Sequence, residues 1–148
     1  MEKKYFDDYE IKEKYLTATR TITETDVMNF ASMSGDMNLL HTSIDYAKDT
    51  DFGERIVHGL LGLSICHGLM FRTGMFEGTV IAFLNIENWE FNYPIFFNDT
   101  LYAQIEVIEK NPSKSKSDRG IVKFFIKLLN QEDKVVQQGS KILMMKRI

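Results

Sequence analysis

An apolar segment near the middle of the chain, residues 56–71, constrains the fold more than any other feature. It contains no Asp, Glu, Lys or Arg over 16 positions and is bounded by Arg55 and Arg72. A membrane-spanning helix needs about 20 apolar residues, and this segment also includes two histidines, a serine and three glycines. Its apolar residues point in every direction on a helix, which is typical of a helix surrounded by protein. The sequence therefore predicts a buried helix over about 56–74 and no membrane span.

After Gly78 the hydrophobic pattern changes to the two-residue period of strands. Apolar or aromatic residues alternate with polar ones over 88–93, 101–107 and 122–128, and 135–145 predicts a fourth strand. The polar connection at 130–133 and the longer polar stretch at 110–120 are typical of hairpin loops. The second half of the chain is thus expected to form a long antiparallel sheet.

Short helices are expected before the apolar segment, following an opening strand over 14–22. Thr23 precedes Asp26 by three residues, a spacing that lets each side chain bind the other's backbone amide at a helix start. Gly35 favours the end of that helix, because glycine accepts the left-handed conformation found there. A second short helix is expected after Thr42-Ser43. The predicted fold class is α+β, with one helix buried by the sheet.

The chain has 148 residues without a repeat or a linker, which predicts one domain over 1–148. Its 18 Lys+Arg against 21 Asp+Glu give a net charge of -3, which argues against a nucleic-acid partner. No apolar run follows the charged start, so no secretory signal peptide is expected. The single cysteine, Cys66, cannot form an internal disulfide. We expect a cytoplasmic protein with neither a nucleic acid nor a membrane as partner.

The first candidate functional segment is Ser34 to His41. Here a carboxylate, Asp36, and an imidazole, His41, lie five residues apart after a helix end. In a turning loop the two side chains can share one water molecule and divide proton removal and proton delivery between them. A second interpretation stays open on spacing alone, in which Asp36 is a turn residue and His41 a surface histidine.

The second candidate segment runs from Phe52 through Gly53 to His58 and Gly59, directly into the apolar helix. Free amides at a helix start, that of Gly59 above all, can bind an oxygen that becomes negatively charged. The alternative is that His58 only caps the helix and Gly59 only permits close packing. A metal site is not expected, because the three histidines and Asp36 lack the short spacings of typical metal ligands.

Three stretches together resemble a known family: GDMNLLH at 35–41, FGERIVHG at 52–59 and WEFNYPIFFNDT at 89–100. They are similar to the MaoC-like dehydratases, which include the (R)-specific enoyl-CoA hydratases and have the hot-dog fold. The family motif is commonly written G-D-x-N-P-[LI]-H. The resemblance extends over nearly the whole chain, and it implies a long antiparallel sheet wrapped around one central helix.

The resemblance also implies an activity, the reversible addition of water to a trans-2-enoyl thioester that gives an (R)-3-hydroxyacyl thioester. It assigns Asp36 and His41 to activation of the water, and the amide of Gly59 to polarisation of the thioester carbonyl. Asn38 matches the asparagine that helps to hold the motif loop. We assign Asn38, His58, Phe52 and Gly53 to substrate binding. The implied substrate is an acyl thioester of coenzyme A or acyl carrier protein, with no cofactor.

One position departs from the motif, because Leu39 stands where the family has proline. Leucine removes the restraint that proline places on the backbone. Two alternatives therefore remain beside hydration: a non-catalytic acyl-CoA-binding or regulatory protein, and a hot-dog acyl-CoA thioesterase. We expect a homodimer, because a second copy would cover the sheet edges and complete the thioester cleft.

Overall fold

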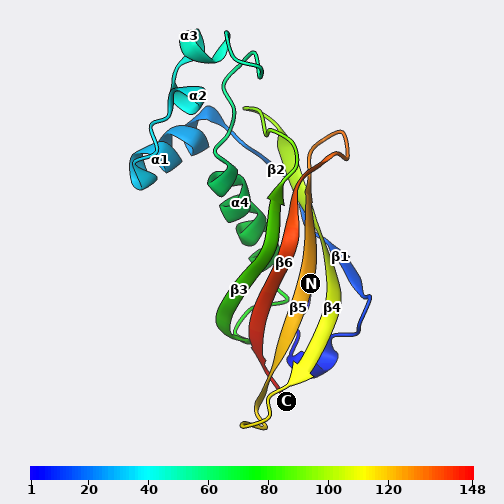
Figure 1. The fold of residues 1–148 in the computed structure, drawn as a ribbon. Helices are drawn as coiled ribbons and strands as arrows, with labels where there is room; N and C mark the ends of the chain where they lie inside the picture. The colour runs from blue at the N-terminus through cyan, green and yellow to red at the C-terminus, as the bar shows by residue number, and fades with distance from the viewer.

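In a computed structural model that describes all 148 residues, a six-stranded antiparallel sheet curves around one helix, α4 (Figure 1). The strands are β1 (Lys14–Leu16), β2 (Arg20–Thr21), β3 (Val80–Phe91), β4 (Thr100–Pro112), β5 (Arg119–Leu129) and β6 (Val135–Lys146). The helices are a 3-10 turn (Phe6–Asp8), α1 (Glu24–Ser34), α2 (Leu39–Thr42), α3 (Ile44–Ala47) and α4 (Gly59–Phe71). The strand order is β1-β4-β5-β6-β3, and β2 also pairs with β4. The α+β class predicted from the sequence is thus confirmed.

The two-residue period of the strands places one face of the sheet against α4. Alternate residues of β4 and β5 are fully buried: Leu101, Ala103, Ile105, Val107, Val122, Phe124, Ile126 and Leu128. These side chains belong to one hydrophobic core that includes Ile65, Leu69 and Met70 of α4. The core fixes α4 on the concave side of the sheet, with its N-terminus directed toward α1–α3 (Figure 1).

The predicted boundaries of α1 are confirmed. The Asp26 amide donates to the Thr23 hydroxyl, and the Thr23 amide donates to the Asp26 carboxylate. Gly35 ends the helix with a φ of 79°, in the left-handed region. Because α1 ends there, the next residue, Asp36, begins a turn.

Other boundaries differ from the prediction. The strand expected over 14–22 is divided into β1 and β2, because the Thr17 hydroxyl accepts the Ala103 amide hydrogen in place of a backbone carbonyl. The short helix expected after Thr42-Ser43 is α3, and α2 before it was not predicted.

The central helix is shorter than predicted and is not buried on every side. It covers Gly59–Phe71, and Leu60 at its start is 61% exposed. The buried side of α4 can pack closely against Gln137 because residue 62 is a glycine. A Cβ at Gly62 would lie only 2.4 Å from Gln137 Nε2. No helix in the structure combines the length and the apolar character needed to cross a membrane.

Candidate active site

Asp36 lies in the turn between α1 and α2, and its conformation is fixed by local hydrogen bonds. Its backbone amide donates to the Ser34 hydroxyl at 3.1 Å, and its carboxylate accepts the Asn38 amide hydrogen at 3.2 Å. The residue is exposed. One carboxylate oxygen is therefore held by the backbone of the turn, which sets the direction of the group.

His41 lies in α2 and not in a loop, which was the expectation from the sequence. Asn38 caps this helix, since its side-chain oxygen accepts the Leu40 amide hydrogen at 3.0 Å. Leu39 occupies the first helical position, where proline is favoured because it needs no amide partner. Helix α2 thus forms without the proline of the family motif.

The imidazole of His41 is 8% exposed and has a defined orientation. Its Nδ1 lies 2.7 Å from the Ile56 carbonyl oxygen. A carbonyl only accepts, so Nδ1 carries the hydrogen and Nε2 of the neutral ring is left with a free lone pair. The tautomer is therefore the one in which Nε2 can act as a base.

His58 stacks on His41, with ring centroids 3.8 Å apart and an interplanar angle of 29°. It occupies the N-cap position of α4 but makes no capping hydrogen bond through its side chain. Instead Nε2 donates to the Asp36 carbonyl at 2.9 Å, and the residue is 2% exposed. His58 thus joins the turn that carries Asp36 to the start of α4.

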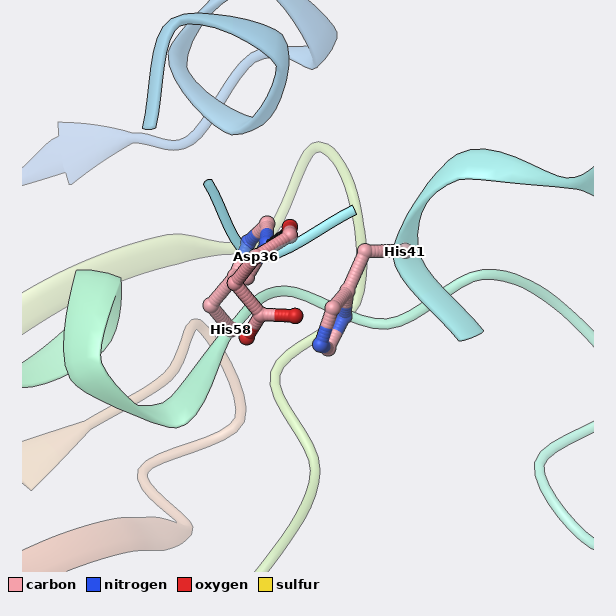
Figure 2. Close-up of side chains that lie close together, drawn as sticks. All are labelled: Asp36, His41 and His58. Atoms are coloured by element: carbon pink, nitrogen blue, oxygen red, sulfur yellow. Dashed lines mark hydrogen bonds between the residues drawn. The ribbon is translucent and has the colours of Figure 1, made fainter. Parts of the chain in front are cut away.

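The side chains of Asp36, His41 and His58 converge, although they come from three separate segments. One carboxylate oxygen and one ring nitrogen from each histidine all lie within 4.8 Å of one another. Figure 2 shows the Asp36 carboxylate directed toward the His41 ring, with His58 behind it. These three residues are also the group whose atoms could hold a metal ion, a cluster that the sequence spacing did not indicate.

Gly59 begins α4 directly after His58, so its amide has no partner within the helix. It also lines a recess of about 290 Å³ between residues 52–59 and 91–95. Phe52, 39% exposed, lines the same recess, whereas Gly53 faces a different hollow beside Lys48 and Arg55. The structure therefore brings Phe52 and Gly59 together but not Gly53.

Gln137 is a buried polar residue of this region that was not among the residues predicted from the sequence. It is 2% exposed, its Nε2 donates to the Gly59 carbonyl at 2.9 Å, and its Oε1 accepts the Trp89 indole hydrogen at 3.1 Å. A glutamine within an alternating strand gives no sign in the sequence that it faces inward. Its two bonds fix the first turn of α4 against β3.

Burial lowers the pKa of the His41 imidazole below its ordinary value of 6.5, because the charged form loses hydration. The positive form of His58 acts in the same direction, whereas the Ile56 carbonyl and the Asp36 carboxylate oppose it. The net shift keeps His41 neutral at pH 7, which is the state that can accept a proton.

The chain is similar to proteins of one family. The family described as "MaoC like domain" matches residues 7–124. Protein MaoC of Klebsiella aerogenes is 35% identical over 115 residues, which make up 78% of this chain and 34% of that protein. The chain therefore spans about a third of the length of that relative. An (R)-specific enoyl-CoA hydratase of Rhodospirillum rubrum is 32% identical over 111 residues, 74% of each chain.

Solved structures show the same likeness. An Archaeoglobus protein described as a monoamine oxidase regulatory protein superposes with a TM-score of 0.91 at 32% identity, over 100% of this chain and 97% of its own. An R-hydratase of Pseudomonas aeruginosa gives 0.81 at 30% identity, over 97% and 86%. A Mycobacterium tuberculosis protein described as a double hotdog fold gives 0.87 at 18% identity, over 99% of this chain and 45% of its own. The fold is thus the hot-dog fold, as the sequence predicted.

Proposed function

The chain belongs to the MaoC-like dehydratase family, and from this premise we propose that it is an (R)-specific enoyl-CoA hydratase. It would add water reversibly to a trans-2-enoyl thioester, and the same groups would remove water from an (R)-3-hydroxyacyl thioester. The thioester carrier is coenzyme A or acyl carrier protein, and no cofactor is needed, because the reaction transfers only a water molecule. We further propose that residues 1–148 act as one domain in the cytoplasm.

The observation that carries this proposal is the convergence of Asp36 and His41 beside the start of α4. A carboxylate and the free Nε2 of a neutral imidazole are both proton acceptors, so a water between them can lose a proton. Its oxygen then bonds to C3 of the substrate, and the proton is returned to C2. Every bond formed and broken belongs to water and substrate.

The amide of Gly59 supplies the second requirement of this chemistry. Attack of water at C3 moves negative charge onto the thioester carbonyl oxygen. An amide at the N-terminus of a 13-residue helix stabilises that charge by a hydrogen bond and by the helix dipole. Because Gln137 and His58 fix this end of the helix, the donor is in place before the charge develops.

Hydration of crotonyl-CoA tests the proposed function. We expect the purified protein to remove the enoyl absorbance and to form (R)-3-hydroxybutyryl-CoA, identified by chiral chromatography. Retention of activity after treatment with EDTA is expected, since no step requires a metal. Release of free thiol from the substrate would show a thioesterase instead. Thermal stabilisation by the ligand without turnover would show a binding or regulatory protein.

We propose a homodimer formed through α4 and the edge of β3. Large apolar side chains remain exposed there, including Leu60, Phe83, Leu84 and Phe91. Because β3 is at the end of the strand order, its outer edge has no partner in the chain. A second copy would cover both features. Sedimentation equilibrium is expected to give twice the mass of 17.2 kDa, and a monomer at micromolar concentration would contradict the proposal.

The pH dependence of turnover follows from the lowered pKa of His41. The neutral ring is the base, so kcat/KM rises as pH increases through the His41 pKa and is level above it. Because burial lowers that pKa, the midpoint of the acid limb is expected below pH 6.5. Initial rates with crotonyl-CoA between about pH 5 and pH 8 measure it. A midpoint above pH 7 would contradict the assignment of His41 as the base.

A further inference from the structure

Three residues from three elements form one hydrogen-bonded chain beside the start of α4. The indole of Trp89 on β3 donates to Gln137 Oε1 on β6 at 3.1 Å, and Gln137 Nε2 donates to the Gly59 carbonyl at 2.9 Å. Gln137 is 2% exposed, so these bonds lie in the protein interior, where hydrogen bonds are stronger than in water. The chain connects two strands of the sheet to the residue whose amide begins the helix.

The indole determines which way the amide of Gln137 faces. An indole N–H can only donate, so the atom next to it must be the amide oxygen. The amide nitrogen is then on the side of α4, where the Gly59 carbonyl can only accept. A reversed amide would place a donor against a donor and an acceptor against an acceptor. Trp89 thus fixes Gln137 in the one orientation that donates to Gly59.

Two further glycines make room for this chain of contacts. A Cβ at Gly62 would clash with Gln137 Nε2, so the absence of a side chain lets the amide approach this face of α4. A Cβ at Gly139 would lie 2.7 Å from Trp89 Cε3 and 2.8 Å from its Cα. Glycine is destabilising inside a helix or a strand, yet it occurs at both positions where a side chain would separate the three residues.

The bond to Gly59 acts on the geometry of the first turn of α4. The Gly59 amide has no partner within the helix, and the backbone of a glycine is less restrained than that of any other residue. A contact from outside the helix therefore has a large effect on the direction of this N–H. A donor to a developing oxyanion is effective when its direction is set before the charge appears.

We infer that Gln137 is a positioning residue for the Gly59 amide and that Trp89 acts through it. Gln137 sets the direction in which the amide meets the thioester oxygen, and it neither gives nor accepts a proton. The inference rests on the proposed function only in taking that oxygen as the ligand of the amide. Two residues of the sheet, both outside the motif at 35–41, thereby control turnover.

Binding of acetoacetyl-CoA tests the inference without turnover. This ligand has no C2–C3 double bond to hydrate, and its enolate, which carries negative charge on the thioester oxygen, has an absorbance band that the ketone lacks. We expect the wild type to raise the enolate fraction of the bound ligand. Gln137→Met, which keeps the length of the side chain, should lower that fraction by about tenfold or more, because the amide is no longer directed at the oxygen. The affinity for butyryl-CoA, whose carbonyl stays neutral, should change by less than about threefold.

Trp89→Phe removes the indole donor and leaves an aromatic ring in place. It should lower the enolate fraction by less than Gln137→Met does, because Gln137 can still donate. The double variant should be no worse than Gln137→Met alone. The matched control is Gln138→Met at the next residue of β6, whose side chain bonds to Glu90 on the exposed side and does not line the recess. This control should behave as the wild type.

Each other outcome overturns the inference. An unchanged enolate fraction in Gln137→Met shows that the amide needs no positioning, and a wild type that does not raise this fraction shows that the amide does not stabilise the charge. An equal loss in Gln138→Met, or an equal loss of butyryl-CoA affinity, shows a general effect on the fold. If Gln137→Met does not fold, Trp89→Phe decides, and an unchanged fraction in that variant overturns the inference.

Hydration of crotonyl-CoA by the wild type judges the proposed function separately. A protein whose bound enolate depends on Gln137 but which does not hydrate crotonyl-CoA refutes only the proposed function. A protein that hydrates crotonyl-CoA equally well with methionine at this position refutes only the inference. In a hydratase, Gln137→Met should lower kcat by about 10–100-fold.

Discussion

Asp36→Asn is expected to lower kcat for crotonyl-CoA hydration by about 10²–10⁴-fold, the usual contribution of a positioned acid or base. The amide has the shape of the carboxylate and its oxygen can still accept the Asn38 amide hydrogen, so the turn is retained. It cannot take a proton from water. The loss should therefore appear in kcat, with the melting temperature nearly unchanged. Steady-state kinetics and thermal unfolding of the same samples measure both.

The control for this variant is Asp45→Asn, which changes an exposed aspartate of the neighbouring helix α3. Asp45 pairs only with Lys48, so turnover should stay within about twofold of the wild type. If Asp36→Asn retains more than about a tenth of the wild-type kcat, the carboxylate is not the proton acceptor that the mechanism requires.

His41→Asn extends the same prediction to the imidazole. The asparagine nitrogen can replace Nδ1 as the donor to the Ile56 carbonyl, while the Nε2 lone pair is lost. A loss of similar size is expected. Because the two groups act on one water, the double variant should be little worse than either single variant. Additive losses would indicate two independent roles.

The parts of the fold that could be predicted are those set by local chemistry. The start of α1 follows from the Thr23–Asp26 spacing, and its end follows from Gly35. The inward residues of β4 and β5 follow from their alternation. Helix α2 was missed because its four residues carry no periodic pattern, and its cap comes from a side chain, Asn38, that is equally common in turns.

The proximity of Asp36 and His41 could be predicted, and His58 was assigned to the site, but the contacts by which His58 joins the other two could not be predicted. His58 contacts them through a backbone carbonyl of Asp36 and a stacked ring, and both contacts depend on how residues 52–59 return past α2. The inward position of Gln137 likewise depends on strand register. Long-range packing of this kind leaves no signal in the spacing of residues along the chain.

Lys141 is a further residue whose buried position the sequence did not indicate. It lies on β6 with no exposed surface, and its Nζ has no hydrogen-bond partner. The Trp89 ring faces this amine, with its centroid 5.3 Å from Nζ. Burial lowers the pKa of this amine, with the Cys66 thiolate opposing the shift. An unpaired buried ammonium costs stability, so Lys141→Met should raise the free energy of unfolding at pH 7 by about 1–3 kcal/mol.

The sign of the pH dependence separates this cause from simple repacking. Because the pKa of Lys141 is lowered in the folded state, the folded chain loses this proton at a lower pH than the unfolded chain does. The contribution of Lys141 to the free energy of unfolding of the wild type therefore rises with pH. The rise lies between the Lys141 pKa in the folded state and its pKa of about 10.4 in the unfolded chain. The advantage of Lys141→Met over the wild type should shrink over the same range.

Cys66 has the opposite effect, because burial raises the pKa of its thiol to about 11 and the unfolded chain loses that proton first. Both proteins keep Cys66, but its charge is coupled to that of Lys141, so its effect does not cancel fully at pH 9.5 in the difference between them. At pH 7 the thiol is protonated in the folded and in the unfolded chain and does not enter that difference. Urea unfolding at pH 7 and pH 9.5 measures the difference in the free energy of unfolding between the two proteins. The control is Lys127→Met, at a partly exposed lysine, which is expected to stay within about 0.5 kcal/mol of the wild type.

If Lys141→Met is less stable than the wild type at pH 7, packing of the lysine stem against α4 and Trp89 outweighs the cost of its charge, and the residue is a structural element of the core.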